Sequence, residues 1–141
     1  MSYMPMATAL GFVAAINAGD LLILRALMTP DHVFTDALGH SYNGAKTMTA
    51  GWERFLHDYP DYCITVERSF VHDDTVALFG HATGCWRVDG KILPQHWTVR
   101  AAWLAEIASG RVAAWSVFCD TGWVTPPVTD GEEMESEAAP N

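Results

Sequence analysis

Positive charge is scarce in this chain. Eight Lys and Arg residues stand against 17 Asp and Glu residues, so the formal net charge is −9 at pH 7. Such a charge repels phosphate backbones, and we therefore expect no nucleic-acid partner. Part of it is local, because acidic residues crowd the C-terminal end: Asp130, Glu132, Glu133, Glu135 and Glu137.

Cysteine is also sparse, and long apolar runs are missing. The three cysteines, Cys63, Cys85 and Cys119, show no CxxC spacing, which favours reduced, buried thiols over a disulfide framework. The longest apolar stretch, residues 21–24, is far too short to span a bilayer, and no signal-peptide pattern opens the chain. The histidines lack paired spacing, so no metal site is expected. These features predict a cytoplasmic protein that does not contact the membrane.

Bulky apolar residues, by contrast, are plentiful. Half of the 141 residues are hydrophobic, with six Trp and six Phe. That composition is typical of a globular chain, and the length fits one domain with its own core. We expect this domain to span residues 1–124. Residues 125–141, rich in proline and acidic side chains, are expected to form a disordered tail.

Apolar periodicity predicts three helices in the first part of the chain. Residues 6–28 show helical spacing that Gly19-Asp20 interrupts, so one helix should end near Gly19. A second should begin at Asp20 as its N-cap and run to Met28. Residues 45–58 carry a third apolar stripe, formed by Met48, Trp52, Phe55 and Leu56.

The remaining segments predict strands. A short strand is expected over residues 32–36, and longer ones are expected over 62–71, 75–88, 95–107 and 111–119. Asp89-Gly90 is a strong hairpin signal after the second of these longer strands. Helices followed by strands indicate an α+β fold, in which the helices cover one face of a strongly curved, mostly antiparallel sheet. Such a cone encloses a pocket.

The order of these elements resembles the nuclear transport factor 2-like superfamily, in particular its SnoaL-like branch, which also has ketosteroid isomerases and polyketide cyclases as relatives. The likeness extends over about residues 8–124. It is carried by residues 12–20 (FVAAINAGD), by Val33-Phe34-Thr35-Asp36 with Gly39, by Asn43-Gly44, and by Gly110-Arg111-Val112 with Trp115 and Asp120. The resemblance implies a cystatin-like roll with a ligand pocket.

Site residues follow from the same resemblance. Asp36 falls where ketosteroid isomerases keep their general-base aspartate, and Asp120 lies near an acid/base aspartate of polyketide cyclases and epoxide hydrolases. The two oxyanion donors of the isomerases are missing, because Phe12 replaces a tyrosine and Ala101 or Ala102 replaces a neutral acid. Loss of such donors costs orders of magnitude in rate, which argues against steroid isomerisation.

The local pattern around Asp36 supports two interpretations. Alternation places Phe34 and Asp36 on one strand face, where lost solvation would raise the carboxyl pKa and create a general base. Alternatively, Asp36 caps the turn formed by residues 37–39. Asp120 presents the same choice between an acid/base and the start of a turn, and the turn is favoured there.

Further polar and aromatic candidates lie along the predicted strands. His96 and Arg100 share a strand face and would donate hydrogen bonds to a ligand oxygen if that face looked inward; otherwise they are solvated. Aromatic side chains could line a pocket for a flat, multi-ring ligand or pack in the core, and the pocket candidates are Phe12, Phe34, Tyr42, Trp52 and Trp115. A homodimer is expected from the family likeness, with Trp97, Trp103 and Phe118 on its interface.

The sequence therefore predicts a SnoaL-like protein that binds a small hydrophobic ligand. The leading hypothesis is a cofactor-independent isomerase, cyclase or hydratase in which Asp36 transfers a proton on a carbonyl metabolite, assisted by Asp120, His96 or Arg100. The alternatives are a non-catalytic ligand-binding domain and a dimeric interaction module of the same fold.

Overall fold

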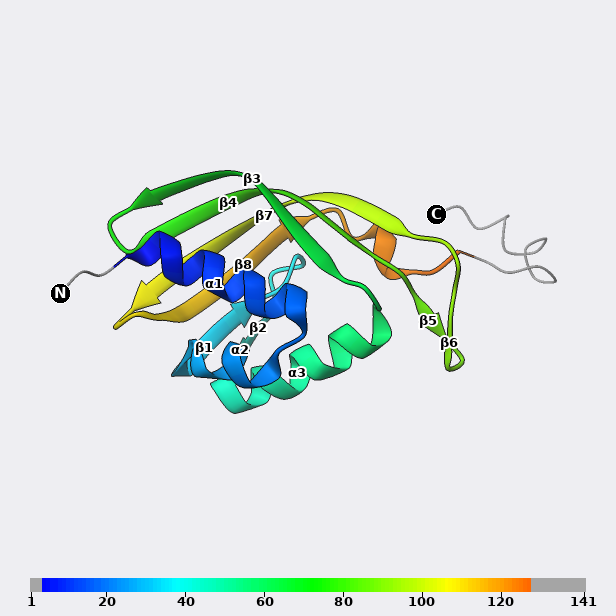
Figure 1. The fold of residues 1–141 in the computed structure, drawn as a ribbon, viewed down its shortest axis with the longest axis horizontal. Helices are drawn as coiled ribbons and strands as arrows, with labels where there is room; N and C mark the ends of the chain where they lie inside the picture. The colour runs from blue at the N-terminus through cyan, green and yellow to red at the C-terminus, as the bar shows by residue number, and fades with distance from the viewer. Residues whose placement is uncertain (1–3, 128–141) are drawn as a thin grey trace.

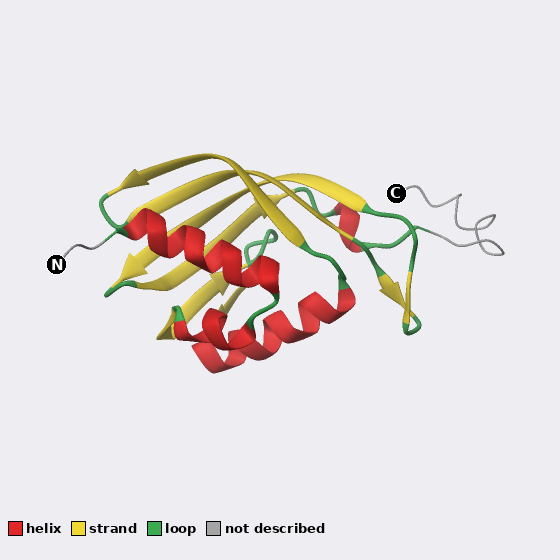
Figure 2. Cartoon of the chain, viewed as in Figure 1, coloured by secondary structure: helices red, strands yellow, loops and turns green. Residues whose placement is uncertain are grey.

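Three helices lie beneath an arched sheet in the computed structural model, which describes residues 4–127 (Figures 1 and 2). The helices are α1 (Pro5–Ala18), α2 (Leu21–Ala26) and α3 (Ala45–Asp58). The sheet has the strand order β2-β1-β8-β7-β4-β3. Its strands are β1 (Met28–Thr35), β2 (Ser41–Asn43), β3 (Cys63–His72), β4 (Thr75–Gly84), β7 (Trp97–Ala108) and β8 (Arg111–Cys119).

Two smaller elements complete the described part of the chain. Strands β5 (Arg87–Val88) and β6 (Lys91–Ile92) form a separate hairpin, and the short 3-10 helix η1 (Gly122–Val124) follows β8. The sheet is antiparallel apart from one parallel pair, β1 with β8. The predicted α+β roll, with three helices on a curved and mostly antiparallel sheet, is confirmed. Residues 128–141, most of the predicted tail, lie outside the described residues.

The helix boundaries follow from local chemistry. Gly19 ends α1 with a left-handed backbone (φ 67°), and the Asp20 carboxylate then accepts a hydrogen bond from the Ile23 amide at 3.1 Å to cap α2. The expected extension of α2 to Met28 is wrong. The helix stops at Ala26 because Met28 pairs with Val112 in the β1–β8 ladder.

The predicted strand over residues 75–88 is too long. Strand β4 ends at Gly84, where the Trp97 indole packs so closely that a Cβ would lie 2.6 Å from it. The chain then leaves the sheet and re-pairs as the β5–β6 hairpin. Its turn is the predicted Asp89-Gly90, both residues having positive φ.

A bulge bends the far edge of the sheet. The β3–β4 register shifts between Val66 and Arg68, which leaves Glu67 as the extra residue. A Cβ on Gly80, opposite this point, would lie 1.9 Å from the Thr65 carbonyl oxygen, so only glycine fits there. Bulges increase local bend and twist, and in Figure 1 β3 and β4 curve over the helices at this end.

Candidate functional site

A cavity of about 670 Å³ lies between α3, the concave face of the sheet and η1. Aromatic rings make up much of its wall: Phe34, Tyr42, Trp52, Phe55, Tyr59, Tyr62, Trp103 and Trp123. The polar or charged residues among its lining are Asp36, Thr47, Arg54, Thr121 and Thr125, together with the Cys119 thiol. The cavity is therefore mainly apolar, with a few polar groups, which is the usual character of a small-molecule site.

Helical and strand periodicity place these side chains. Met48, Trp52 and Phe55 are four and three residues apart on α3, so they share the face that looks onto the sheet. On β7, alternation directs Val99, Ala101 and Trp103 inward. Small side chains such as Ala82 and Ala101 line the sheet side and leave space above them.

The C-terminal end of the described chain forms one wall. Trp123 stacks on Trp97 with ring centroids 4.1 Å apart. Two hydrogen bonds hold this segment to the rest of the domain. The Trp86 indole N–H donates to the Trp123 carbonyl at 2.7 Å, and the Tyr59 hydroxyl donates to the Val124 carbonyl at 3.2 Å.

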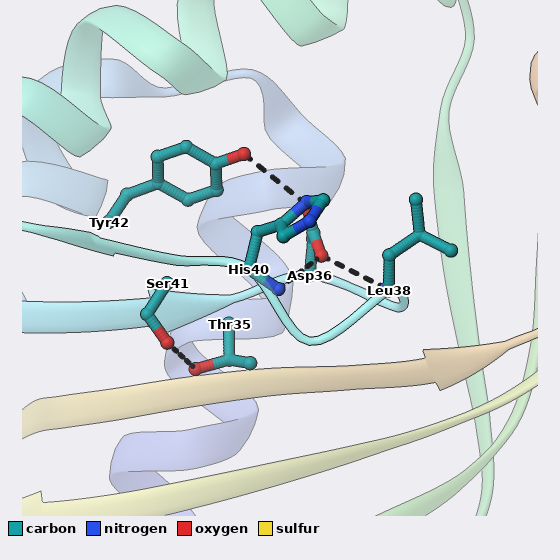
Figure 3. A network of polar contacts seen from close by, with 6 residues as sticks. All are labelled: Thr35, Asp36, Leu38, His40, Ser41 and Tyr42. Atoms are coloured by element: carbon teal, nitrogen blue, oxygen red, sulfur yellow. Dashed lines mark hydrogen bonds and ion pairs between the residues drawn. The ribbon is translucent and has the colours of Figure 1, made fainter.

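Asp36 lies at the tip of the β1–β2 hairpin and lines the cavity (Figure 3). Its Oδ1 accepts hydrogen bonds from the Leu38 amide at 3.0 Å and the His40 amide at 2.9 Å. Its Oδ2 lies 3.4 Å from the Tyr42 hydroxyl and 3.6 Å from His40 Nδ1. The carboxylate therefore caps its own turn, as the second interpretation expects, and it also borders the cavity.

The pKa of Asp36 shifts opposite to the expectation. Partial burial pushes the pKa up, but the amide hydrogen bonds from His40 and Leu38, the nearby His40 ring and the Tyr42 hydroxyl more than offset it. The net result is a lowered pKa. The side chain is 30% exposed, and its loss of solvation is too small to outweigh these donors. At neutral pH the group is an ionised hydrogen-bond acceptor.

The other predicted acid/base and donor residues lie away from the cavity wall. Asp120 is exposed and accepts a hydrogen bond from the Gly122 amide at 2.9 Å, so it starts a turn. Arg100 is exposed in a groove on the opposite face of the sheet, beside Phe118, because its position on β7 alternates with the inward-facing residues. His96 is exposed just before β7 begins.

Three of the five predicted pocket residues, Phe34, Tyr42 and Trp52, line the cavity. The structure corrects the other two. Phe12 and Trp115 are fully buried in the core, where their ring centroids lie 4.7 Å apart, and neither is among the lining residues.

The residues predicted for a dimer interface also divide between the two faces. Trp97 and Trp103 are buried on the concave side, whereas Phe118 is exposed on the outer face. Alternation along β7 explains the difference, because odd-numbered positions from 97 to 107 face inward.

A further correction concerns Cys63, which is exposed rather than buried.

Sequence reasoning missed several lining residues, notably Tyr62 and Trp123. Tyr62 could have been found, because it comes just before β3 and alternates with Ile64 and Val66, which places its side chain on the same side of the chain as theirs. Trp123 gave no usable signal, since it follows a turn and reaches the cavity only through contacts distant in sequence.

Metal-binding clusters and membrane-spanning helices are both absent from the described residues. Residues 4–127 contain no group of three or more His, Cys, Asp or Glu side chains arranged to hold a metal ion. Within the same range, no helix has the length and apolar character needed to cross a membrane.

Solved structures share this fold at low sequence identity. A candidate polyketide cyclase from Pseudomonas putida superposes with a TM-score of 0.78 at 18% identity, covering 87% of this chain and 97% of that one. A candidate SnoaL-like polyketide cyclase from Jannaschia sp. gives 0.74 at 21% identity, covering 97% and 93%. A protein with a ketosteroid isomerase-like fold from Catenulispora acidiphila, in complex with trimethylamine, gives 0.66 at 17% identity, covering 79% and 83%.

Sequence comparison gives the family. None of the curated proteins compared with the chain matches it significantly. The sequence model described as the SnoaL-like domain, however, matches residues 9–115, which include most of α1, all of α2 and α3, and most of the sheet. This chain belongs to the SnoaL-like domain family.

Proposed function

We propose that this domain binds an apolar, flat small molecule of several rings in the cavity beneath the sheet. The observation that carries the proposal is the cavity itself, because about 670 Å³ of aromatic-walled space suits a ligand of drug-like size. Edge-on and tilted contacts among Trp52, Phe55 and Tyr62 hold these rings in place before a ligand arrives. Preformed rings contribute contact area at little entropic cost.

The structural neighbours support the choice of ligand class. Several are candidate polyketide cyclases, and one holds trimethylamine. For the present domain, the mainly apolar lining favours a hydrophobic carbonyl compound of the polyketide type. Asp36 and Arg54 provide polar contacts at its wall.

Titration with a small aromatic ketone tests this proposal. 2-Acetylnaphthalene should change the intrinsic tryptophan fluorescence saturably, because three tryptophans line the cavity. Gly51 on α3 also lines it, and a Cβ there would meet only the end of Met48, at 3.7 Å. Gly51→Leu should fill the space and abolish binding, while the matched variant Ala50→Leu, on the exposed side of α3, should bind as the wild type does. Equal binding by both variants would refute the proposal that the ligand occupies this cavity.

Proton transfer by Asp36 is the second candidate function. Its ionised carboxylate borders the cavity, so it could accept a proton α to a ligand carbonyl. The hydrogen bonds that lower its pKa also weaken it as a base, which makes simple binding the better supported proposal. Asp120, His96 and Arg100 are not among the lining residues, so this candidate function does not include them.

The two candidates differ in one measurement. If Asp36 is a base, the methyl protons of bound 2-acetylnaphthalene should exchange with D₂O faster than in buffer, and Asp36→Asn should remove the acceleration. If the domain only binds, Asp36→Asn should leave the affinity nearly unchanged, and no acceleration should appear in either protein.

A homodimer through the outer face of the sheet is proposed as the quaternary state. Phe70, Phe79 and Phe118 are exposed there around a groove that also contains Arg68 and Arg100. Exposed aromatic clusters of this kind are costly unless covered. Sedimentation should report a dimer for the wild type and a monomer for Phe118→Asp; a monomeric wild type would contradict the proposal.

A further inference from the structure

The Tyr62 hydroxyl is a polar group in an apolar part of the cavity. Tyr62 follows the turn between α3 and β3, lines the cavity, and is only 9% exposed. Across residues 4–127, no group forms a hydrogen bond with its hydroxyl. Tyrosine hydroxyls on largely buried side chains usually find a hydrogen-bond partner, and a ligand in the cavity would supply one here.

The ring of Tyr62 is held firmly by its neighbours. Phe55 meets it edge-on with centroids 4.8 Å apart, Trp97 lies at 5.9 Å and Trp52 at 6.4 Å. These contacts come from α3 on one side and from the start of β7 on the other. The hydroxyl therefore has a fixed position, as a preorganised binding group requires.

A second N–H donor, the Trp103 indole, also borders the cavity. The Trp103 indole lies close enough to influence Tyr62, yet within the described residues its Nε1–H is buried without a hydrogen-bond partner. The contact between the two side chains thus falls short of a hydrogen bond. An indole N–H that donated to the phenolic oxygen would leave the phenolic O–H free to donate onward to a ligand, and such chains strengthen each member.

We propose that Tyr62 donates a hydrogen bond to the carbonyl oxygen of the ligand, with the Trp103 indole N–H of the same cavity as a supporting donor. This inference rests on the proposed function and specifies the ligand class. The bound molecule carries an acceptor oxygen at the end that enters the aromatic cavity beside Tyr62, and apolar rings occupy the remaining space. An apolar molecule without such an oxygen would leave both donors unsatisfied.

The protonation state of Tyr62 agrees with a donor role. Burial strongly raises the pKa of the phenol, Cys119 and Cys63 raise it further, and the Trp103 indole offsets only part of the rise. The hydroxyl therefore keeps its proton throughout the physiological pH range. It acts as a neutral donor and not as a base.

A pair of probes of the same shape tests the inference. 2-Acetylnaphthalene has the carbonyl, and 2-isopropenylnaphthalene has a CH₂ group in place of its oxygen. The quantity to measure is the ratio of their affinities in the wild type and in Tyr62→Phe. Since one neutral hydrogen bond is worth about 1 kcal/mol net, the preference for the ketone should fall about fivefold in Tyr62→Phe.

Tyr59→Phe is the matched control, because it removes another hydroxyl from the cavity wall. That hydroxyl already donates to the Val124 carbonyl. Tyr59→Phe should therefore change the affinities for the two probes by the same factor and leave their ratio as in the wild type.

The infrared carbonyl stretch of the bound ketone gives a second readout. In the wild type it should lie at a lower wavenumber than in cyclohexane, and Tyr62→Phe should move it back. An unshifted stretch in the wild type would overturn the inference even if Tyr62→Phe failed to fold. Binding of both probes with an unchanged ratio in Tyr62→Phe would overturn it and leave the proposed function intact. If neither probe bound, the proposed function would fail, and the inference with it.

Discussion

Adding one methyl group at Gly80 should destabilise the domain, whereas the same change at Gly51 should stabilise it. At Gly80 the new Cβ would lie 1.9 Å from the Thr65 carbonyl oxygen, 3.0 Å from the Thr65 carbonyl carbon and 3.1 Å from the Glu67 nitrogen. All three are backbone atoms at the β3 bulge, so they cannot rotate away as a side chain would. At Gly51 the Cβ meets only the Met48 side chain, at 3.7 and 3.8 Å.

The size of the expected stability changes follows from this geometry. Relaxing the Gly80 contact from 1.9 to 3.0 Å needs a shift of 1.1 Å between β3 and β4. Overpacking typically costs about 1–3 kcal/mol, and lost ladder hydrogen bonds add about 1 kcal/mol each. Both variants gain about 0.4–1 kcal/mol from a less flexible unfolded chain. We therefore expect Gly80→Ala to lose roughly 3 kcal/mol and Gly51→Ala to gain roughly 0.5–1 kcal/mol.

Urea unfolding followed by circular dichroism measures both values. The midpoints should move in opposite directions, and similar m-values would show that the two variants unfold from comparably compact states. A Gly80→Ala protein as stable as the wild type would refute the idea that glycine is required opposite the bulge. In that case the close approach of β3 and β4 would not account for the bend of the sheet.

Three further outcomes follow from the structure. Asp36→Ala should cost about 1 kcal/mol because it removes an acceptor from two amides, whereas Asp36→Asn should cost less, since its amide oxygen still accepts; thermal unfolding will distinguish them. Burial lowers the pKa of His32, despite the opposing Val112 carbonyl and Asp31, so the unfolded chain binds more protons. Stability should fall as pH drops below about 6.5, and His32→Leu should flatten that slope. Trp123→Ala should cost about 2 kcal/mol through lost ring contacts, and it should also weaken binding of 2-acetylnaphthalene; an unchanged affinity would exclude η1 from the site.

Local sequence signals were enough to predict the boundaries of some helices and strands. The apolar stripe of α3, with Gly44 before it and a proline at position 60 after it, predicts the boundaries Ala45–Asp58 that the structure has. Strand β8 is bounded by the Ser109-Gly110 turn and also matches its prediction. In both cases the information lies within or next to the element.

Other features depend on partners far along the chain. Nothing near Gly84 indicates that Trp97 will pack on it and end β4. The start of β1 at Met28 likewise depends on pairing with Val112. Competing local preferences near these positions pointed to a longer strand and a longer helix, and tertiary contacts overrode both.

In the candidate site, too, some features follow from local sequence pattern and others depend on the folded structure. Alternation identified Phe34 as inward-facing, but the protonation of Asp36 depends on the amides of its own turn. Sequence spacing gives the strand face on which a carboxylate lies, and it does not give the number of N–H groups directed at that carboxylate. The expected rise in pKa failed for this reason.

The two alanines that line the sheet side of the cavity have a consequence for the size of ligand that the cavity accepts. Ala82 and Ala101 lie on neighbouring central strands, where branched side chains would suit the backbone better. Each methyl group added at either position would reduce the cavity volume available to a ligand without altering the helices on the other side of the cavity. Larger side chains at these two sheet positions would therefore restrict the cavity to ligands with fewer fused rings and leave the hydrogen-bonding groups untouched.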